Sequence, residues 1–258
     1  HTGWVRNVAF SRDSKRLAAT SWVQTSKIWD VASGRELATL AGHQGWATGL
    51  AFDPVGTDLA TGSQDGAVRL WDADTSRATA LTNAHPGGVM SIAYQPGGMT
   101  LATAGMDGMV RIWDVATHQL LAEQGKRGDL PVNSVAYSPD CQKIITAGDD
   151  RAAVIRAADT GAEILALSEH VSAVTAAVFS PDGSRVATAS ADTFGRVFDS
   201  HSGKLRLTLE GNTRGVFDIA YAPDGSRLAT AGADGSVRVW DAATGLQQSE
   251  LRGHSNEV

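Results

Sequence analysis

The sequence predicts an all-β fold assembled from six copies of one unit, each about 42 residues long. The first marker of the repeat is a Trp-Asp pair or its equivalent. Its tryptophan position is filled, at steps of 42, 42, 43, 42 and 42 residues, by Trp29, Trp71, Trp113, Arg156, Phe198 and Trp240. The second marker is a histidine position with the same steps, which holds His1, His43, His85, Gly128, His170, Asn212 and His254. Two independent markers that keep one spacing indicate a true repeat rather than a chance match.

Each copy is expected to form four short strands, which the second copy shows well. Its strands are expected over residues 46–52, 58–63, 67–72 and 77–82. These stretches are rich in Val, Leu, Thr and aromatic residues, as strands are. The segments that join the first two strands carry Asp, Pro and Gly, the residues of tight turns. They include 53–57, 138–141, 180–183 and 222–225.

The repeat also predicts how the copies assemble. A four-stranded sheet of this size cannot bury both faces alone, so like units must stack, and radial stacking gives a β-propeller. We expect one domain over residues 1–258, and the start of a further repeat at 254–258 suggests a longer, seven-bladed array. The expected repeat bounds are 1–42, 43–84, 85–127, 128–169, 170–211 and 212–253.

Composition sets limits on the function classes. The formal net charge of -6 argues against a broad nucleic-acid-binding surface. No apolar run reaches the 18 residues of a membrane span. The single cysteine, Cys141, provides neither an intramolecular disulfide nor a zinc cluster. The repeated histidines fall in different copies, too dispersed to meet at one ion, so no metal site is expected.

These features resemble those of the WD-repeat β-propeller family over the whole chain. The motifs that carry the resemblance are Gly-His at 42–43 and 253–254, the 42-residue period, and Trp-Asp at 29–30, 71–72, 113–114 and 240–241. The resemblance implies a hydrogen-bonded chain in each blade, which we call the network. It joins the repeat His to a Thr of the second strand, an Asp of the following turn and the Trp of the third strand.

The network carries over residue by residue. The second, third and sixth copies are expected to hold His43, Thr61, Asp65 and Trp71; His85, Thr103, Asp107 and Trp113; and Asn212, Thr230, Asp234 and Trp240. The other copies depart from the pattern, the fifth by Phe198, the fourth by Gly128 and Arg156, and the first by Ala19 and Val23. A hydroxyl, an imidazole and a carboxylate are also the groups of a nucleophilic triad. Because the set recurs from copy to copy, and because threonine is a poor nucleophile without activation, a structural role is favoured.

Three tryptophans lie outside the repeat pattern. The resemblance places Trp4, Trp22 and Trp46 on adjacent blades and on one face, where first strands begin and second strands end; we call it the top face. The same face is expected to carry Arg6, Met90, Met106 and Phe217. One interpretation is that a ring folds down over the central channel. The other is a binding surface, because Trp, Met and Arg are enriched at interface cores.

The resemblance implies a non-catalytic scaffold that binds a protein or peptide through its top face. We expect a cytoplasmic chain that forms the sensor or scaffold part of a larger bacterial signalling protein, with no cofactor, no nucleic acid and no membrane partner. The alternative is an enzyme propeller of the hydrolase or quinoprotein type. A third hypothesis, an engineered repeat array, is disfavoured by the irregular copies.

Overall fold

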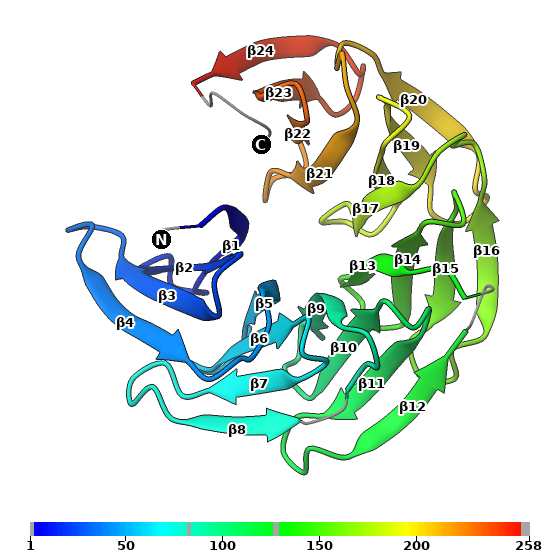
Figure 1. Cartoon of the computed structure of the whole chain (residues 1–258). Coiled ribbons are helices and arrows are strands. Elements are labelled where there is room, and N and C mark those ends of the chain that lie inside the picture. The colour runs from blue at the N-terminus through cyan, green and yellow to red at the C-terminus, as the bar shows by residue number, and fades with distance from the viewer. Residues whose placement is uncertain (1–2, 82–83, 126–128, 254–258) are drawn as a thin grey trace. The chain divides into compact units, whose positions relative to one another are not determined.

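A computed structural model describes residues 3–81, 84–125 and 129–253 of the chain. Every regular element in these ranges is a β-strand, and each sheet consists of four consecutive antiparallel strands (Figure 1). The predicted fold class is therefore confirmed, and the six repeats form the blades of a β-propeller. In the second blade the observed strands agree with the expected ones to within one or two residues at each end.

The chain divides into two compact units, of which the first spans residues 1–132. Its first blade contains β1 (Val5–Phe10), β2 (Arg16–Ser21), β3 (Thr25–Asp30) and β4 (Glu36–Ala41). Its second blade contains β5 (Ala47–Phe52), β6 (Leu59–Ser63), β7 (Val68–Trp71) and β8 (Ala78–Leu81). Its third blade contains β9 (Val89–Tyr94), β10 (Thr100–Gly105), β11 (Val110–Asp114) and β12 (Leu120–Gln124).

The second unit spans residues 133–258 and begins within the first strand of the fourth blade. That blade contains β13 (Val132–Tyr137), β14 (Lys143–Gly148), β15 (Ala153–Ala157) and β16 (Glu163–Leu167). The fifth contains β17 (Val174–Phe179), β18 (Arg185–Ser190), β19 (Gly195–Asp199) and β20 (Leu205–Leu209). The sixth contains β21 (Val216–Tyr221), β22 (Arg227–Gly232), β23 (Ser236–Asp241) and β24 (Gln247–Arg252).

Two predictions on organisation stay predictions, namely the single domain and the seventh blade. The residues on which the further repeat depends, 254–258, lie outside the described residues, as do His1 and Gly128.

The Asp of the Trp-Asp pair has a local role in the turn that follows it. Asp241 Oδ1 accepts the backbone N–H groups of Ala243 and Thr244, and Gly245 closes the turn at a φ of +75°. A carboxylate that bonds the backbone two and three residues ahead is a common turn device, and glycine adopts positive φ without steric cost. The repeated Asp therefore fixes the hairpin between the third and fourth strands.

The hydrophobic core lies between neighbouring blades of each unit. In the first unit, Val68 and Leu70 of β7 pack with Val89 and Ile92 of β9 in one buried cluster. In the second unit, Val197 and neighbouring side chains of the fifth blade pack with residues of the sixth. This packing agrees with the argument that one small sheet cannot bury both of its faces.

A β-bulge interrupts the first strand of most blades at its second residue. Pairing of β1 with β2 skips Arg6, and pairing of β5, β17 and β21 skips Thr48, Thr175 and Phe217. A bulge turns the extra side chain away from the ladder direction. Thr48 and Thr175 use this freedom to donate to Val89 O and Val216 O of the next blade, at 2.5 and 2.7 Å.

Candidate functional site

The network forms in full in the second blade. The indole Nε1–H of Trp71 donates to Thr61 Oγ1 at 2.8 Å, and this hydroxyl lies 2.8 Å from His43 Nε2. His43 Nδ1 lies 3.2 Å from Asp65 Oδ2. The same carboxylate accepts the backbone N–H groups of Gln44 and Ala67 at 2.7 and 2.9 Å. One chain of polar groups thus ties β6 and β7 to the loop before the blade and to the β6–β7 turn.

The third blade repeats this geometry and adds an arginine. Trp113 Nε1 donates to Thr103 Oγ1 at 2.9 Å, and His85 bridges Thr103 and Asp107 with both distances at 2.8 Å. Arg111 Nη1 donates to Asp107 Oδ2 at 2.6 Å. The guanidinium therefore neutralises the carboxylate at the end of the chain of hydrogen bonds.

The histidine lies between groups that suit either of its tautomers. The Thr103 hydroxyl accepts from Trp113, and with its second lone pair and its own hydrogen it can accept from or donate to His85 Nε2. His85 Nδ1 lies 2.8 Å from both Asp107 Oδ1 and Arg111 Nη1. Burial lowers the pKa of His43, His85 and His170, and the attraction of the neighbouring carboxylate only partly opposes that shift.

The network carboxylates remain charged. Burial raises the pKa of Asp192, but hydrogen bonds from His170 and Arg196 outweigh it and lower the pKa to about 2. Burial opposes the shift at Asp65 and Asp107 too, and hydrogen bonds again hold the pKa of both carboxyls below the usual value.

Arginine recurs on the third strands of the second, third, fifth and sixth blades, at Arg69, Arg111, Arg196 and Arg238. Arg111, Arg196 and Arg238 each donate to the network Asp four residues before them. Arg69 differs, because its guanidinium donates to Gly42 O at 2.9 Å.

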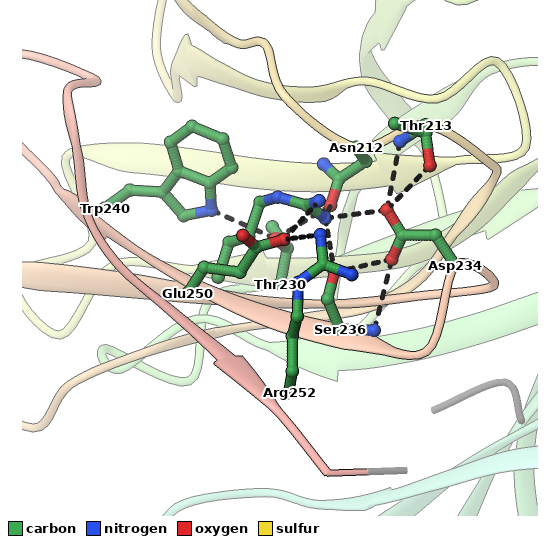
Figure 2. A network of polar contacts seen from close by, with 9 residues as sticks. Asn212, Thr213, Thr230, Asp234, Ser236, Trp240, Glu250 and Arg252 are labelled. Atoms are coloured by element: carbon green, nitrogen blue, oxygen red, sulfur yellow. Dashed lines mark hydrogen bonds and ion pairs between the residues drawn. The ribbon is translucent and has the colours of Figure 1, made fainter. Parts of the chain in front are cut away.

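The sixth blade rebuilds the network around asparagine (Figure 2). Trp240 Nε1 donates to Thr230 Oγ1 at 3.0 Å, and Thr230 Oγ1 donates to Asn212 Oδ1 at 3.5 Å. Arg238 Nη1 then joins Asn212 Oδ1 to Asp234 Oδ2, both at 2.9 Å. Arg238 therefore provides the link that an imidazole makes elsewhere, and the buried Asn212 Nδ2 has no hydrogen-bond partner within the described part of the chain.

The blades that depart from the pattern do so to different degrees. In the fifth, His170 bridges Thr188 and Asp192 at 2.7 and 2.8 Å, so Phe198 removes only the indole link and is itself fully buried. In the fourth, the buried Arg156 replaces Trp and lies 3.5 Å from the Glu163 carboxylate. The first blade has Ala19 and Val23 at two network positions, so it lacks both the hydroxyl and the carboxylate.

Burial decides between the structural and the catalytic interpretations of this set. Thr61, Thr103 and Thr230 are fully buried. A nucleophile must reach its substrate, and these hydroxyls are enclosed between the indole and the imidazole or, for Thr230, the Asn212 amide. Across the described ranges there is also no group of three His, Cys, Asp or Glu side chains that could hold a metal ion. The burial and the bonds of these hydroxyls support a structural role for the network.

The three tryptophans outside the repeat pattern lie together in the first unit. The rings of Trp22 and Trp46 are parallel within 8°, and those of Trp4 and Trp22 within 30°, both pairs with centroids 4.8 Å apart. All three side chains are exposed, Trp4 by 60%, Trp22 by 39% and Trp46 by 42%. We call this set the tryptophan row; it joins the first blade to the second.

Backbone hydrogen bonds at the top face hold the row in place. Trp22 N donates to Trp4 O at 2.9 Å, and Gln64 N donates to Trp46 O at 3.0 Å, so equivalent positions of two blades are fixed in the same way. The side chain of Gln24 donates to Gln44 O at 3.1 Å and links the two blades beside the rings. The rings therefore extend from a rigid backbone rather than from long loops.

The other residues predicted for the top face are spread over several blades. Arg6 is exposed at the β1 bulge, and Met90 is half-buried at the corresponding position of β9. Met106 is exposed in the β10–β11 turn, at the position that Trp22 has in the first blade, and its N–H donates to Gly88 O. Phe217 is half-buried in the second unit, at the bulge of β21.

Comparisons with known proteins agree with the fold. Residues 203–241 match a family model described as WD domain, G-beta repeat. Residues 4–198, which include the row and most of the network, match the model described as Nucleolar protein 10-like, N-terminal domain. The chain belongs to the nucleolar protein 10-like N-terminal domain family. No curated protein matches it.

The family match confirms the predicted resemblance to WD-repeat β-propellers, a fold that serves generally as a scaffold for protein interactions and is typically non-catalytic. Within the nucleolar protein 10-like segment, the sequence pattern located the network but not the arginine at its end. The spacing of Asp107 and Arg111, four residues apart across a tight turn, was the available signal. No helix of the described residues is long and apolar enough for a membrane crossing.

Proposed function

We propose that this chain is a non-catalytic scaffold that binds a peptide or protein through the top face of its first unit. The observation that carries the proposal is the tryptophan row, three exposed and stacked indoles on adjacent blades. Large exposed aromatic clusters in soluble proteins are generally functional, and Trp is the residue most enriched among binding hot spots.

The surroundings of the row favour a role in partner binding over a purely structural role. The network tryptophans have buried indole N–H groups that bond to threonine, whereas the rings of the row remain open to solvent. Arg6 adds an exposed guanidinium two residues after Trp4, and Met106 adds a flexible thioether on the same face of the unit. Such a surface combines rigid aromatic anchors with adaptable neighbours.

No observation favours the enzyme hypothesis, because the triad-like hydroxyls that suggested it are enclosed in the network. We propose no cofactor, and the net charge of -6 supports a protein rather than a nucleic acid as partner.

The cellular setting is a separate proposal. The composition and repeats led us to propose a cytoplasmic scaffold within a larger bacterial signalling protein. The matched family takes its name from a nucleolar protein, which supports the nucleolus as the other location. Imaging of the tagged full-length protein in its source cell decides between the two.

Affinity capture tests the proposed binding face. The immobilised chain and its Trp4→Ala and Trp46→Ala variants are compared with Met99→Ala and Asp224→Ala, which alter exposed turn residues at the other end of their blades. We expect the tryptophan variants to bind the captured partner with an affinity at least tenfold lower, equivalent to about 1.4 kcal/mol or more. The turn variants should bind it as the original chain does. Retention by the tryptophan variants together with loss by the turn variants would contradict the proposal. Circular dichroism checks that every variant is folded.

A further inference from the structure

The geometry of the tryptophan row limits what it can bind. Trp22 stacks on both Trp4 and Trp46, so neighbouring rings cover part of its ring faces, while 39% of the residue stays exposed. Each indole also carries an Nε1–H, a donor with no acceptor capacity. The row is thus a stack of three rings with three donors rather than an open aromatic platform.

Among the residues that the structure describes, the three donors of the row have no acceptor. None of the hydrogen bonds found among the described ranges uses the indole N–H of Trp4, Trp22 or Trp46. By contrast, Trp71, Trp113 and Trp240 all donate to threonine hydroxyls. A ligand that suits the row must therefore present acceptors close to apolar groups that can pack on aromatic carbon.

Two common ligands of aromatic sites fit this geometry poorly. Recognition of a quaternary ammonium group uses aromatic rings arranged as a cage around the cation, but here the rings are parallel within 8° and 30°. Stacking of a sugar or a base needs an open ring face, and the central ring is covered by its neighbours. A ligand that lies across the ring edges fits better.

A polyproline II helix has the required chemistry. It forms no internal hydrogen bonds, so its carbonyls are free to accept, and its pyrrolidine rings are apolar. It advances about 9 Å in one turn of three residues, which is close to the length of two successive 4.8 Å steps along the row. Because it is preformed, it loses little conformational entropy when it binds to a rigid aromatic surface.

We propose that the tryptophan row binds an extended, proline-rich segment of a partner in the polyproline II conformation. The rings pack against the proline side chains, and the indole N–H groups donate to the backbone carbonyls between them. This proposal rests on the proposed function, because it names the chemical class of the partner that the same face binds. The opposing hypothesis is a structural staple, in which the row only compensates for the network that the first blade lacks.

The test uses decaproline as the probe and the whole 258-residue chain. Nitrogen-15 NMR spectra follow the indole N–H signals during the titration. We expect saturable binding that shifts the signals of Trp4, Trp22 and Trp46 and leaves those of Trp71, Trp113 and Trp240 in place. A Gly-Ser peptide of equal length is the control for non-specific contact and should cause no shift.

Variants separate the donor from the ring. Trp22→Phe and Trp46→Phe keep an aromatic ring but remove the N–H, and each should weaken decaproline binding by about tenfold, the loss expected for one hydrogen bond. Leu121→Ala, an exposed change on the outer strand β12, should leave the affinity unchanged. Urea unfolding confirms that the variants keep the stability of the original chain.

The outcomes distinguish the ligand class from the binding face. Absence of decaproline binding, or equal binding by the phenylalanine variants, overturns the polyproline proposal. If the captured partner still depends on Trp4 and Trp46 in that case, the proposed function stands and only the ligand class is wrong. If the tryptophan variants also retain the partner, both proposals fall and the structural staple is the better account.

Discussion

The indole rings of Trp22 and Trp46 lie 4.8 Å apart and parallel within 8°, although one comes from the first blade and the other from the second. Both of these tryptophans, out of seven in the chain, lie outside the repeat pattern. Trp4, which also lies outside it, stacks on Trp22 and adds a third ring. Tryptophan therefore has two roles in this chain: the network tryptophans donate inward to threonine, and the row faces solvent.

The hydroxyl at the centre of the network should be important for stability. Thr103→Val keeps the shape of the side chain but removes the acceptor for Trp113 Nε1 and the hydrogen-bond partner of His85 Nε2. Because both partners are buried, we expect a loss of about 1–3 kcal/mol in the free energy of unfolding. Thr79→Val, at an exposed position of the outer strand β8, is the matched control and should change it by less than about 0.5 kcal/mol. Equal losses in urea titrations would contradict the assignment.

Replacing asparagine in the sixth blade should increase stability. Asn212 Nδ2 is buried without a partner, whereas the histidines at this position in the second, third and fifth blades use both ring nitrogens. We expect Asn212→His to raise the free energy of unfolding by about 1 kcal/mol. The reciprocal change, His43→Asn, should lower it. A decrease for Asn212→His would show that Arg238 has already taken the place of the imidazole.

The lowered histidine pKa values predict acid sensitivity. Burial keeps the pKa of His43, His85 and His170 below the ordinary value of 6.5. As the pH falls through about 6.5, the unfolded chain binds protons at these histidines and the folded chain does not. The free energy of unfolding therefore decreases from about pH 6.5 down to the pKa of the histidines in the folded state. Loss continues below about pH 4, since the carboxylates of Asp65, Asp107 and Asp192 have lowered pKa values too.

Unfolding free energies measured between about pH 7.5 and 5 test this account. His85→Asn should make the dependence on pH shallower, whatever its effect on stability at neutral pH. Thr79→Val, which removes no titratable group, should leave the slope unchanged. An unchanged slope for His85→Asn would mean that the buried imidazoles do not control the acid response.

The stacks of the row should be separable by mutation. Trp22 belongs to both stacked pairs, so Trp22→Ala should abolish the exciton signal of coupled indoles in circular dichroism, while Trp4→Ala should leave the Trp22–Trp46 contribution. An aromatic pair contributes about 0.5–1.5 kcal/mol, so Trp22→Ala should cost about twice as much stability as Trp4→Ala. An exciton signal that survives Trp22→Ala would rule out the observed stacking in solution.

The repeat made the fold and the network predictable. Two markers at one spacing place His43, Thr61, Asp65 and Trp71 in four fixed positions of a blade, and hydrogen bonds join them there. The fifth blade shows the limit of this reasoning, because the sequence keeps the His, Thr and Asp and lacks only the tryptophan, which does not tell whether the three that remain bond to one another. The structure adds that His170, Thr188 and Asp192 still connect.

The row was predictable only in part. Position in the repeat indicated that Trp4, Trp22 and Trp46 share a face, but stacking depends on side-chain rotamers and on the approach of two blades, which no spacing encodes. The sequence did not predict the bulge at Arg6. Its only signal lies in other blades, where the equivalent positions hold the polar residues Thr48 and Thr175, whose hydroxyls bond to the next blade.

The most direct test of the two tryptophan roles is hydrogen exchange of the indole N–H groups, followed by NMR after transfer to deuterated water. The account predicts that the signals of Trp71, Trp113 and Trp240 persist, because their donors are buried and bonded to threonine. The signals of Trp4, Trp22 and Trp46 should disappear first. Protection of the row equal to that of the network would contradict the claim that its donors are open to a ligand.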